Sequence, residues 1–241
     1  MDEKIDFNNL PKHVAIIMDG NRRWAKQKGL DPKLGHREGA KALENIALYA
    51  NEIGLKYLTV YAFSTENWKR AEDEVGTLML LLQNYLERFS KKADAYNIKI
   101  NILGDIEVLN DGLKKQIKEA IEKTKNNTGL VLNVAFNYGG RAEIIKATKE
   151  IVKRVQNGEL NLEDINDAEF EKGLYTAGQP DPDLLIRTSG ELRTSNYLPW
   201  QIVYSEFYFT DKFWPEFDNE ELLKSIFSSI DSPLSVIFFF Y

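Results

Sequence analysis

Short apolar runs alternate with longer segments of helical periodicity along most of the chain. The runs are Val14–Met18, Tyr57–Phe63, Ile98–Leu103, Val131–Phe136, Leu184–Ile186 and Ile202–Phe207. Helical patterns lie between most of them, at 36–53, 74–95, 110–124 and 142–156. Strands that are apolar along their length are buried on both faces, and alternation with helices is typical of parallel sheets. The sequence therefore predicts an α/β fold with a mostly parallel central sheet of about six strands, covered by helices.

The predicted fold occupies one domain, residues 1–241. Neither repeats, low-complexity stretches nor a Pro/Gly-rich linker divides the chain. Residues 1–12 form a short polar N-terminal segment without the apolar core of a signal peptide, and 228–241 form an unusually apolar tail. No window approaches the roughly 20 apolar residues of a membrane span. We expect a cytoplasmic protein, and peripheral contact with the inner face of the membrane stays open.

The segments that follow the predicted strands are rich in arginine, although the net charge is −6. They are Asp19–Trp24, Ser64–Arg70, Gly104–Asp105, Asn137–Arg141 and Arg187–Gly190, the last with Arg193 and Ser195 just beyond. Ligands of such sheets bind at the carboxyl ends of the strands, and arginines and helix N-termini suit phosphate oxygens. A single such turn is more simply read as an ordinary loop with a solvated arginine. Because four of five turns share the pattern, we predict an anion site.

Composition and missing signatures limit the chemistry of that site. The chain has no G-x-x-x-x-G-K-[ST] loop and no G-x-G-x-x-G turn after the first strand, which disfavours nucleotide and dinucleotide folds. With no cysteine and only two histidines, a bound metal must be a hard cation held by carboxylates and substrate oxygens, which favours Mg²⁺. The negative charge excludes a protein-wide basic field for nucleic acid.

The predicted helix 74–95 carries an unusual apolar stretch, Leu78–Leu82. This stretch is apolar all round, so both of its faces should be covered. One interpretation is a fully buried core helix. The other is a helix with one face on the sheet and the other lining an apolar tunnel beneath the strand ends. A phosphate-binding rim above an apolar tunnel would suit a lipid diphosphate.

Several long motifs resemble those of the cis-prenyltransferase family, of the undecaprenyl diphosphate synthase type. They are His13–Ala25, Gly35-His36, Tyr61–Arg70, Asn137–Arg141, Pro180–Glu191 and Tyr204–Phe209, which occur in the family's order and spacing. The resemblance covers residues 11 to about 217. It implies Mg²⁺-dependent condensation of isopentenyl diphosphate with an allylic diphosphate, expected to be farnesyl diphosphate. The product would be a long cis-polyprenyl diphosphate such as undecaprenyl diphosphate, the cell-wall carrier-lipid precursor.

The resemblance also implies roles for individual residues. Asp19 would be the essential carboxylate that handles Mg²⁺ and assists the leaving group, and Glu206 a second metal carboxylate, contributed by the neighbouring subunit of a homodimer. Asn67 resembles the proposed proton acceptor; because an amide is a poor base, we read it as orienting the reacting groups. The substrate-binding residues implied are Gly20, Asn21, Arg22, Arg23, Trp24, His36, Ser64, Thr65, Glu66, Trp68, Arg70, Arg187, Arg193, Thr194 and Ser195.

Two departures from the family pattern bear on activity. Pro32 stands where the family usually has an arginine for the allylic diphosphate, and the adjacent Lys33 lacks the fork geometry of arginine. The tail 228–241 lacks the usual basic Arg-x-Gly ending, which is consistent with an altered gene end or with a membrane-touching tail. The alternative functions are therefore a weakened or non-catalytic subunit that binds prenyl diphosphates and, more distantly, a nucleotide-binding domain.

Overall fold

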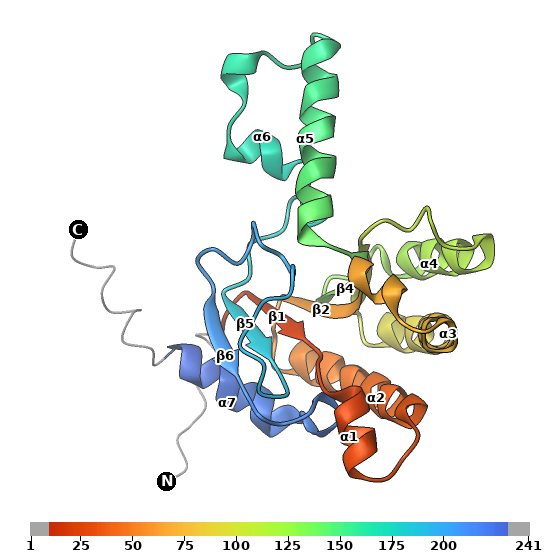
Figure 1. The fold of residues 1–241 in the computed structure, drawn as a ribbon. Coiled ribbons are helices and arrows are strands. Elements are labelled where there is room, and N and C mark those ends of the chain that lie inside the picture. The colour runs from red at the N-terminus through yellow and green to blue at the C-terminus, as the bar shows by residue number, and fades with distance from the viewer. Residues whose placement is uncertain (1–9, 231–241) are drawn as a thin grey trace.

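A parallel sheet forms the centre of the protein (Figure 1). The structure is a computed structural model that describes residues 10–230. Within them the strands are β1 (His13–Ile17), β2 (Tyr57–Ser64), β3 (Lys99–Leu103), β4 (Val131–Tyr138), β5 (Leu184–Arg187) and β6 (Glu206–Phe209). Their spatial order is β3-β4-β2-β1-β5-β6, and each pairing is parallel. The predicted α/β single-domain fold is confirmed.

Helices connect the strands in the way that parallel pairing requires. They are α1 (Asn21–Gln27), α2 (Pro32–Glu52), α3 (Glu72–Ala95), α4 (Asp111–Thr124), α5 (Gly140–Gln156), α6 (Asp167–Glu171) and α7 (Asn219–Ile230), with short 3-10 turns η2 (Thr65–Lys69), η3 (Leu162–Asp164) and η4 (Trp214–Glu216). In Figure 1, α5 extends away from the sheet with α6 beside it, whereas α2, α3, α4 and α7 lie against the body.

The two faces of the sheet are covered differently. On one face, buried side chains of α2, α3 and α7, such as Ile46, Phe89 and Leu222, pack against the strands in the largest apolar cluster. On the other face the loop that follows β5 supplies Tyr197 and Leu198, which pack against β1 and β4. This second cover is a loop rather than a helix, and it belongs to the same segment that carries Arg193 and Ser195.

The strand register brings the site-bearing turns together. Ile17, the last residue of β1, pairs with Tyr61 of β2 on one side and with Arg187 of β5 on the other. The turns after β1 and β5 therefore begin at one level of the sheet, whereas β2 continues beyond Tyr61 to Ser64 before its turn begins at the same edge. Three short segments that are far apart in sequence meet at this edge.

Two sequence-based expectations were wrong. The last strand begins at Glu206 instead of Ile202, because the backbone at Ile202 makes turn hydrogen bonds with Leu198 and Ser205, and the next side chains, Val203 and Tyr204, are 66% and 92% exposed. The stretch Leu78–Leu82 is not covered on all sides, since Leu80 is 57% exposed and Leu82 only 7%. The tail 231–241 and residues 1–9 lie outside the described residues. No helix among residues 10–230 is long and apolar enough to cross a membrane.

Candidate active site

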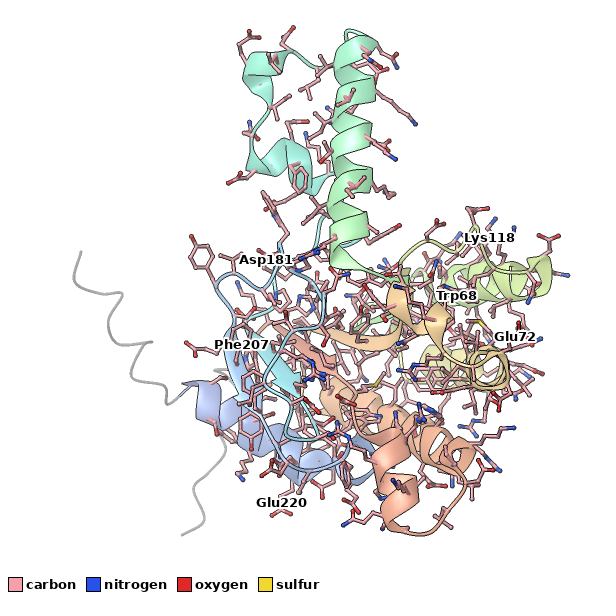
Figure 2. The ribbon with its side chains drawn as sticks, viewed as in Figure 1. Trp68, Glu72, Lys118, Asp181, Phe207 and Glu220 are labelled. Carbon is pink, nitrogen blue, oxygen red and sulfur yellow. The ribbon has the colours of Figure 1, made fainter. Side chains whose placement is uncertain are left out.

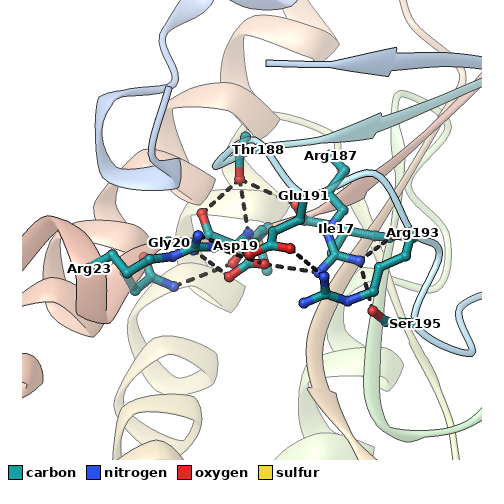
Figure 3. Close-up of polar contacts among 11 residues, drawn as sticks. Ile17, Asp19, Gly20, Arg23, Arg187, Thr188, Glu191, Arg193 and Ser195 are labelled. Carbon is teal, nitrogen blue, oxygen red and sulfur yellow. Dashed lines mark hydrogen bonds and ion pairs between the residues drawn. The ribbon is translucent and has the colours of Figure 1, made fainter. Parts of the chain in front are cut away.

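Asp19 lies in the turn after β1, at the centre of the site (Figure 3). Its carboxylate accepts hydrogen bonds from the Gly20 amide at 2.7 Å and from Nη2 of Arg187 at 2.9 Å, and Nη2 of Arg23 lies 3.3 Å away. Burial raises the pKa of Asp19, but the hydrogen bond and charge of Arg187 and the charge of Arg23 outweigh it and hold the pKa below its ordinary value. Asp19 is therefore ionised at neutral pH.

The backbone of the Asp19 turn is fixed from β5. The Thr188 hydroxyl accepts from the Asp19 amide at 2.9 Å and donates to the Asp19 carbonyl at 2.7 Å. Gly20 has φ of +101°, and a Cβ there would lie 2.7 Å from the Phe213 ring. Both the backbone conformation and the packing therefore require glycine at this position.

Arg187 connects this turn to the loop after β5. Its side chain is only 4% exposed. Nη2 donates to Asp19, while Nη1 donates to Ser195 Oγ at 2.7 Å and to the Arg193 carbonyl (Figure 3). Because this buried guanidinium donates to both segments, it fixes the Asp19 carboxylate and the Arg193–Ser195 loop relative to each other.

Glu191 holds the two more exposed arginines of this region. Its carboxylate forms an ion pair with Nη1 of Arg23, at 3.0 Å, and another with Nη1 of Arg193. The side chains of Arg23 and Arg193 are 45% and 63% exposed. Exposed ion pairs of this kind are weak, so these guanidiniums are available to an incoming anion.

A second group of cations converges on Glu74 of α3. Arg22 from α1 lies 3.1 Å from the Glu74 carboxylate, Arg70 lies 2.7 Å from it, and Nε2 of His36 lies 3.8 Å from it. His36 is in the second turn of α2, which begins at Pro32, not at the helix start that the sequence indicated. Burial lowers the pKa of His36; Glu74 opposes this shift, while Arg70 and Arg22 add to it.

Two polar cavities open between these groups. The larger, of about 610 Å³, is lined by the predicted site residues Asp19, Gly20, Asn21, Arg22, Arg23 and His36, together with Lys26, Pro32 and Arg70. The smaller, of about 340 Å³, includes Asp19, Ser64, Asn67, Arg70, Arg187, Arg193 and Ser195. Asp19 and Arg70 belong to both linings, so the two cavities share a wall at the ionised carboxylate.

An apolar cavity of about 100 Å³ lies against both polar cavities. It shares Met18, Asn21 and His36 with each of them, and its other walls include Leu78, Leu82 and Phe136. Helix α3 thus lines an apolar space with one face and packs on the core with another. This volume is far smaller than a long prenyl chain, so the predicted tunnel stays a proposal.

The remaining predicted substrate residues lie outside the two polar linings of the described chain. Trp24 is buried and donates from Nε1 to Glu216 at 3.0 Å, and Trp68, labelled in Figure 2, donates to Asn137 at 2.7 Å. Thr65 donates to Glu66 at 3.2 Å. The Thr194 carbonyl accepts from the Tyr197 amide at 3.1 Å. These residues support the turns that carry the lining residues.

The second predicted metal carboxylate does not approach Asp19 within one chain. Glu206 begins β6 and pairs with Leu184, whereas Asp19 follows the strand level of Arg187. At the rise of a strand this separates the two levels by about 10 Å. Residues 10–230 contain no cluster of three or more acidic or histidine side chains arranged around a metal position.

Comparison with known proteins gives the same assignment as the geometry. The profile of the family described as "Putative undecaprenyl diphosphate synthase" matches residues 17–229. The chain belongs to this family. A Micrococcus luteus relative named ditrans,polycis-undecaprenyl-diphosphate synthase ((2E,6E)-farnesyl-diphosphate specific) is 51% identical over 93% of this chain and 90% of its own length. An isoprenyl transferase from Fusobacterium nucleatum is 52% identical over 90% of this chain and 92% of its own.

Solved structures of the family have the same fold. Lavandulyl diphosphate synthase from Lavandula x intermedia, in complex with dimethylallyl diphosphate, superposes with a TM-score of 0.89 at 38% identity, over 91% of this chain and 95% of that one. The resemblance inferred from the motifs is confirmed, and the chain is a prenyltransferase.

Two residues of the site were not predicted from the sequence. Glu74 lies among several acids at the start of α3, and nothing in the sequence distinguishes it from Glu72 or Asp73. Lys26 lines the larger cavity beside Pro32, at the place where the expected arginine is missing. Its spacing from Arg22 and Arg23 on one short helix was the available signal.

Proposed function

We propose that this prenyltransferase condenses isopentenyl diphosphate with farnesyl diphosphate and makes a long cis-polyprenyl diphosphate such as undecaprenyl diphosphate. The observation that carries the proposal is the meeting of two cation-lined cavities at Asp19, with an apolar cavity against both. Two diphosphates and one growing hydrocarbon chain need three such spaces. The name of the Micrococcus luteus relative, which specifies farnesyl diphosphate, supports the choice of starter.

The larger cavity suits the allylic diphosphate, with Arg22, Arg23 and Lys26 facing its oxygens. Guanidinium groups stabilise the charge that builds on the departing diphosphate as the allylic carbon ionises. The smaller cavity suits isopentenyl diphosphate, with Arg187, Arg193 and Ser195 as its donors. The double bond of isopentenyl diphosphate then attacks the allylic carbon, whose bond to diphosphate breaks, and the carbocation that forms loses a proton to the departing diphosphate. Asn67 accepts the Ser64 amide at 3.0 Å, a contact that supports an orienting role rather than that of a base.

The donor set fits a Mg²⁺ ion that is held mainly by substrate. Mg²⁺ is commonly bound by one or two carboxylates together with phosphate oxygens, and Asp19 is an ionised carboxylate shared by both cavities. When bound, the ion would neutralise diphosphate charge. Glu206 would act only from a neighbouring subunit. The edge strand β6 has two exposed aromatic side chains, Phe207 (labelled in Figure 2) and Phe209. They support a homodimer whose interface lies near residues 205–217.

We also place the enzyme in the cytoplasm, with product transfer at the inner face of the membrane. A polyprenyl diphosphate has a long apolar chain that water does not dissolve. The site lies in a protein whose described helices do not span a bilayer. Product release therefore requires a membrane surface or a carrier.

The experiment is product formation from farnesyl diphosphate and labelled isopentenyl diphosphate, with and without Mg²⁺, followed by mass spectrometry of the extracted lipids. Asp19→Asn keeps the shape of the side chain and removes its charge, and it should lower the rate about 10²- to 10³-fold. Asp111→Asn is the matched control, because the Asp111 side chain is 99% exposed on α4.

Long magnesium-dependent products in the wild type and the control would establish the activity and the chain length. Absence of product, with retained binding of farnesyl diphosphate, would favour the binding-only subunit that Pro32 raises as an alternative. Absence of both would contradict the proposed substrates.

A further inference from the structure

Asn196, in the loop after β5, is bonded to two other strand-end turns at once. Its side-chain Nδ2 donates to Glu66 Oε1 at 3.0 Å, in the turn after β2. Its Oδ1 accepts from the Arg141 amide at 2.9 Å, and its main-chain carbonyl accepts from the Gly140 amide at 2.9 Å, both at the start of α5 after β4. Three of the turns at the active edge therefore meet at one residue.

The backbone around Asn196 explains why asparagine suits this position. Asn196 has φ of +63°, and the preceding Ser195 has φ of +51°. Asparagine enters this left-handed region more readily than most residues. The same residue supplies both a donor and an acceptor on its side chain, which the two neighbouring turns need.

The turns around Asn196 are packed without spare room. A Cβ at Gly140 would lie 2.0 Å from Cδ of Pro199, and one at Gly139 would lie 2.5 Å from the Thr65 hydroxyl and 3.1 Å from Asn196 Nδ2. Because the turns are in such close contact, none of them can move without displacing the others.

One neighbour of Asn196 in the chain lines the cavity proposed for isopentenyl diphosphate, and the other packs against its wall. Ser195, the residue before it, accepts a hydrogen bond from Arg187 at 2.7 Å and lines that cavity. Tyr197, the residue after it, is buried and stacks on Tyr61 of β2 with ring centroids 4.4 Å apart. Glu66, at the other end of the Nδ2 bond, lies between Ser64 and Asn67, which line the same cavity.

We propose that Asn196 is a positioning residue for isopentenyl diphosphate: it locks the Arg193–Ser195 loop to the Ser64–Asn67 turn and to the start of α5. It acts through those segments and not by touching substrate. Arg22 and Lys26, which line the larger cavity but not the smaller one, are not bonded to Asn196 in the described chain, so the allylic side should be unaffected. The kinetic part of this inference rests on the proposed function.

Asn196→Asp separates the two side-chain bonds. Aspartate keeps an acceptor for the Arg141 amide and nearly the same shape, but it loses the donor and opposes the Glu66 carboxylate. We expect the KM for isopentenyl diphosphate to rise about tenfold, with the KM for farnesyl diphosphate within about twofold of wild type. Asn157→Asp is the matched control, because Asn157 also donates its amide to a glutamate, Glu159, at 3.0 Å on the surface.

Exchanging the partners provides a rescue that a merely damaged fold would not show. Glu66→Gln gives residue 66 a donor, which can face the introduced aspartate in the double variant N196D/E66Q. Adding Glu66→Gln should therefore lower the KM for isopentenyl diphosphate in the Asn196→Asp background. In the wild-type background glutamine still offers Oε1 to Asn196 Nδ2, so there the same change should leave the KM within about twofold. Hydrogen exchange gives a readout without catalysis: the amides of 64–67 should exchange faster in Asn196→Asp and recover in the double variant, whereas the Arg141 amide, whose acceptor aspartate keeps, should exchange as in the wild type.

Equal increases in both KM values, or no rescue by Glu66→Gln, would overturn the inference. Unchanged exchange at 64–67 would overturn it as well. If the wild type makes no polyprenyl product, the proposed function fails, whereas the exchange data still decide whether Asn196 holds the Ser64–Asn67 turn in place.

Discussion

Two polar regions of the same sheet are built from similar residues but differ in how completely their hydrogen bonds are made. At the amino end of β1, His13 is fully buried; its Nδ1 contacts the Pro180 carbonyl at 2.7 Å and its Nε2 contacts the Thr59 hydroxyl at 2.6 Å. Asn133 completes this network, donating to Thr59 at 2.9 Å and to Gln179 at 2.6 Å. This amino-end network is closed by the protein itself.

The carboxyl edge of the sheet is left open. The buried atoms Asn21 Oδ1, His36 Nε2 and Arg187 Nε have no hydrogen-bond partner in the described chain. Buried polar groups normally have partners, so unmet ones call for an explanation. Here they lie in the walls of the cavities that we assign to diphosphates. The chain's two histidines thus serve different ends, one structural and one in the site.

The closed network should make stability depend on pH. Burial lowers the pKa of His13 to about 4; the Pro180 carbonyl and Asp183 oppose this shift only in part. Between pH 6.5 and 4, His13 is protonated in the unfolded chain but not in the folded chain. The free energy of unfolding is therefore highest above this window and decreases as the pH falls through it. The loss should reach about 3 kcal/mol, measured by urea unfolding at several pH values.

His13→Gln is the control for this dependence, since glutamine does not titrate. Its unfolding free energy should vary less across the same window, whatever its absolute stability. An equally steep dependence in that variant would assign the effect to other groups.

The open region should respond in catalysis rather than in pH stability. Arg187→Lys retains a positive charge but cannot reach Asp19, Ser195 and the Arg193 carbonyl together. We expect kcat/KM to fall about tenfold or more, measured by isopentenyl incorporation. Arg88→Lys is the control, because the Arg88 side chain on α3 is 63% exposed and, among the described residues, pairs only with Glu44 of α2, outside both cavity linings. A wild-type rate in Arg187→Lys would show that the fork geometry is unimportant.

We expect the smallest effect at Glu74, whose carboxylate forms ion pairs with two arginines of the larger cavity. Glu74 pairs with Arg22 and Arg70, which line the cavity that we propose for the allylic diphosphate. Glu74→Gln removes this competition, and the Kd for inorganic diphosphate should fall about two- to fivefold by calorimetry. Glu44→Gln is a close match, since Glu44 also binds two cations, Arg88 and Lys92. Weaker binding in Glu74→Gln alone would show that Glu74 organises the cations instead of competing for them.

The sequence predicts features that depend on neighbouring residues better than features that depend on contacts between distant parts of the chain. The first five strands follow from local apolar runs, and their ends fall within two residues of the predicted ones. The turn residues follow from motif order. The exposed Leu80 and the displaced start of β6 do not follow, because local hydrophobicity carries no information on which neighbour covers a side chain. Glu74 and Asn196 escaped for the same reason: their partners lie far along the chain.

The central claim is that the open edge holds two separate diphosphate sites. Its most direct test is calorimetry with isopentenyl diphosphate and a non-reactive farnesyl diphosphate analogue, each titrated in the presence and absence of the other with Mg²⁺. We predict one molecule of each per chain, bound together. Mutual displacement at a single site would contradict the account.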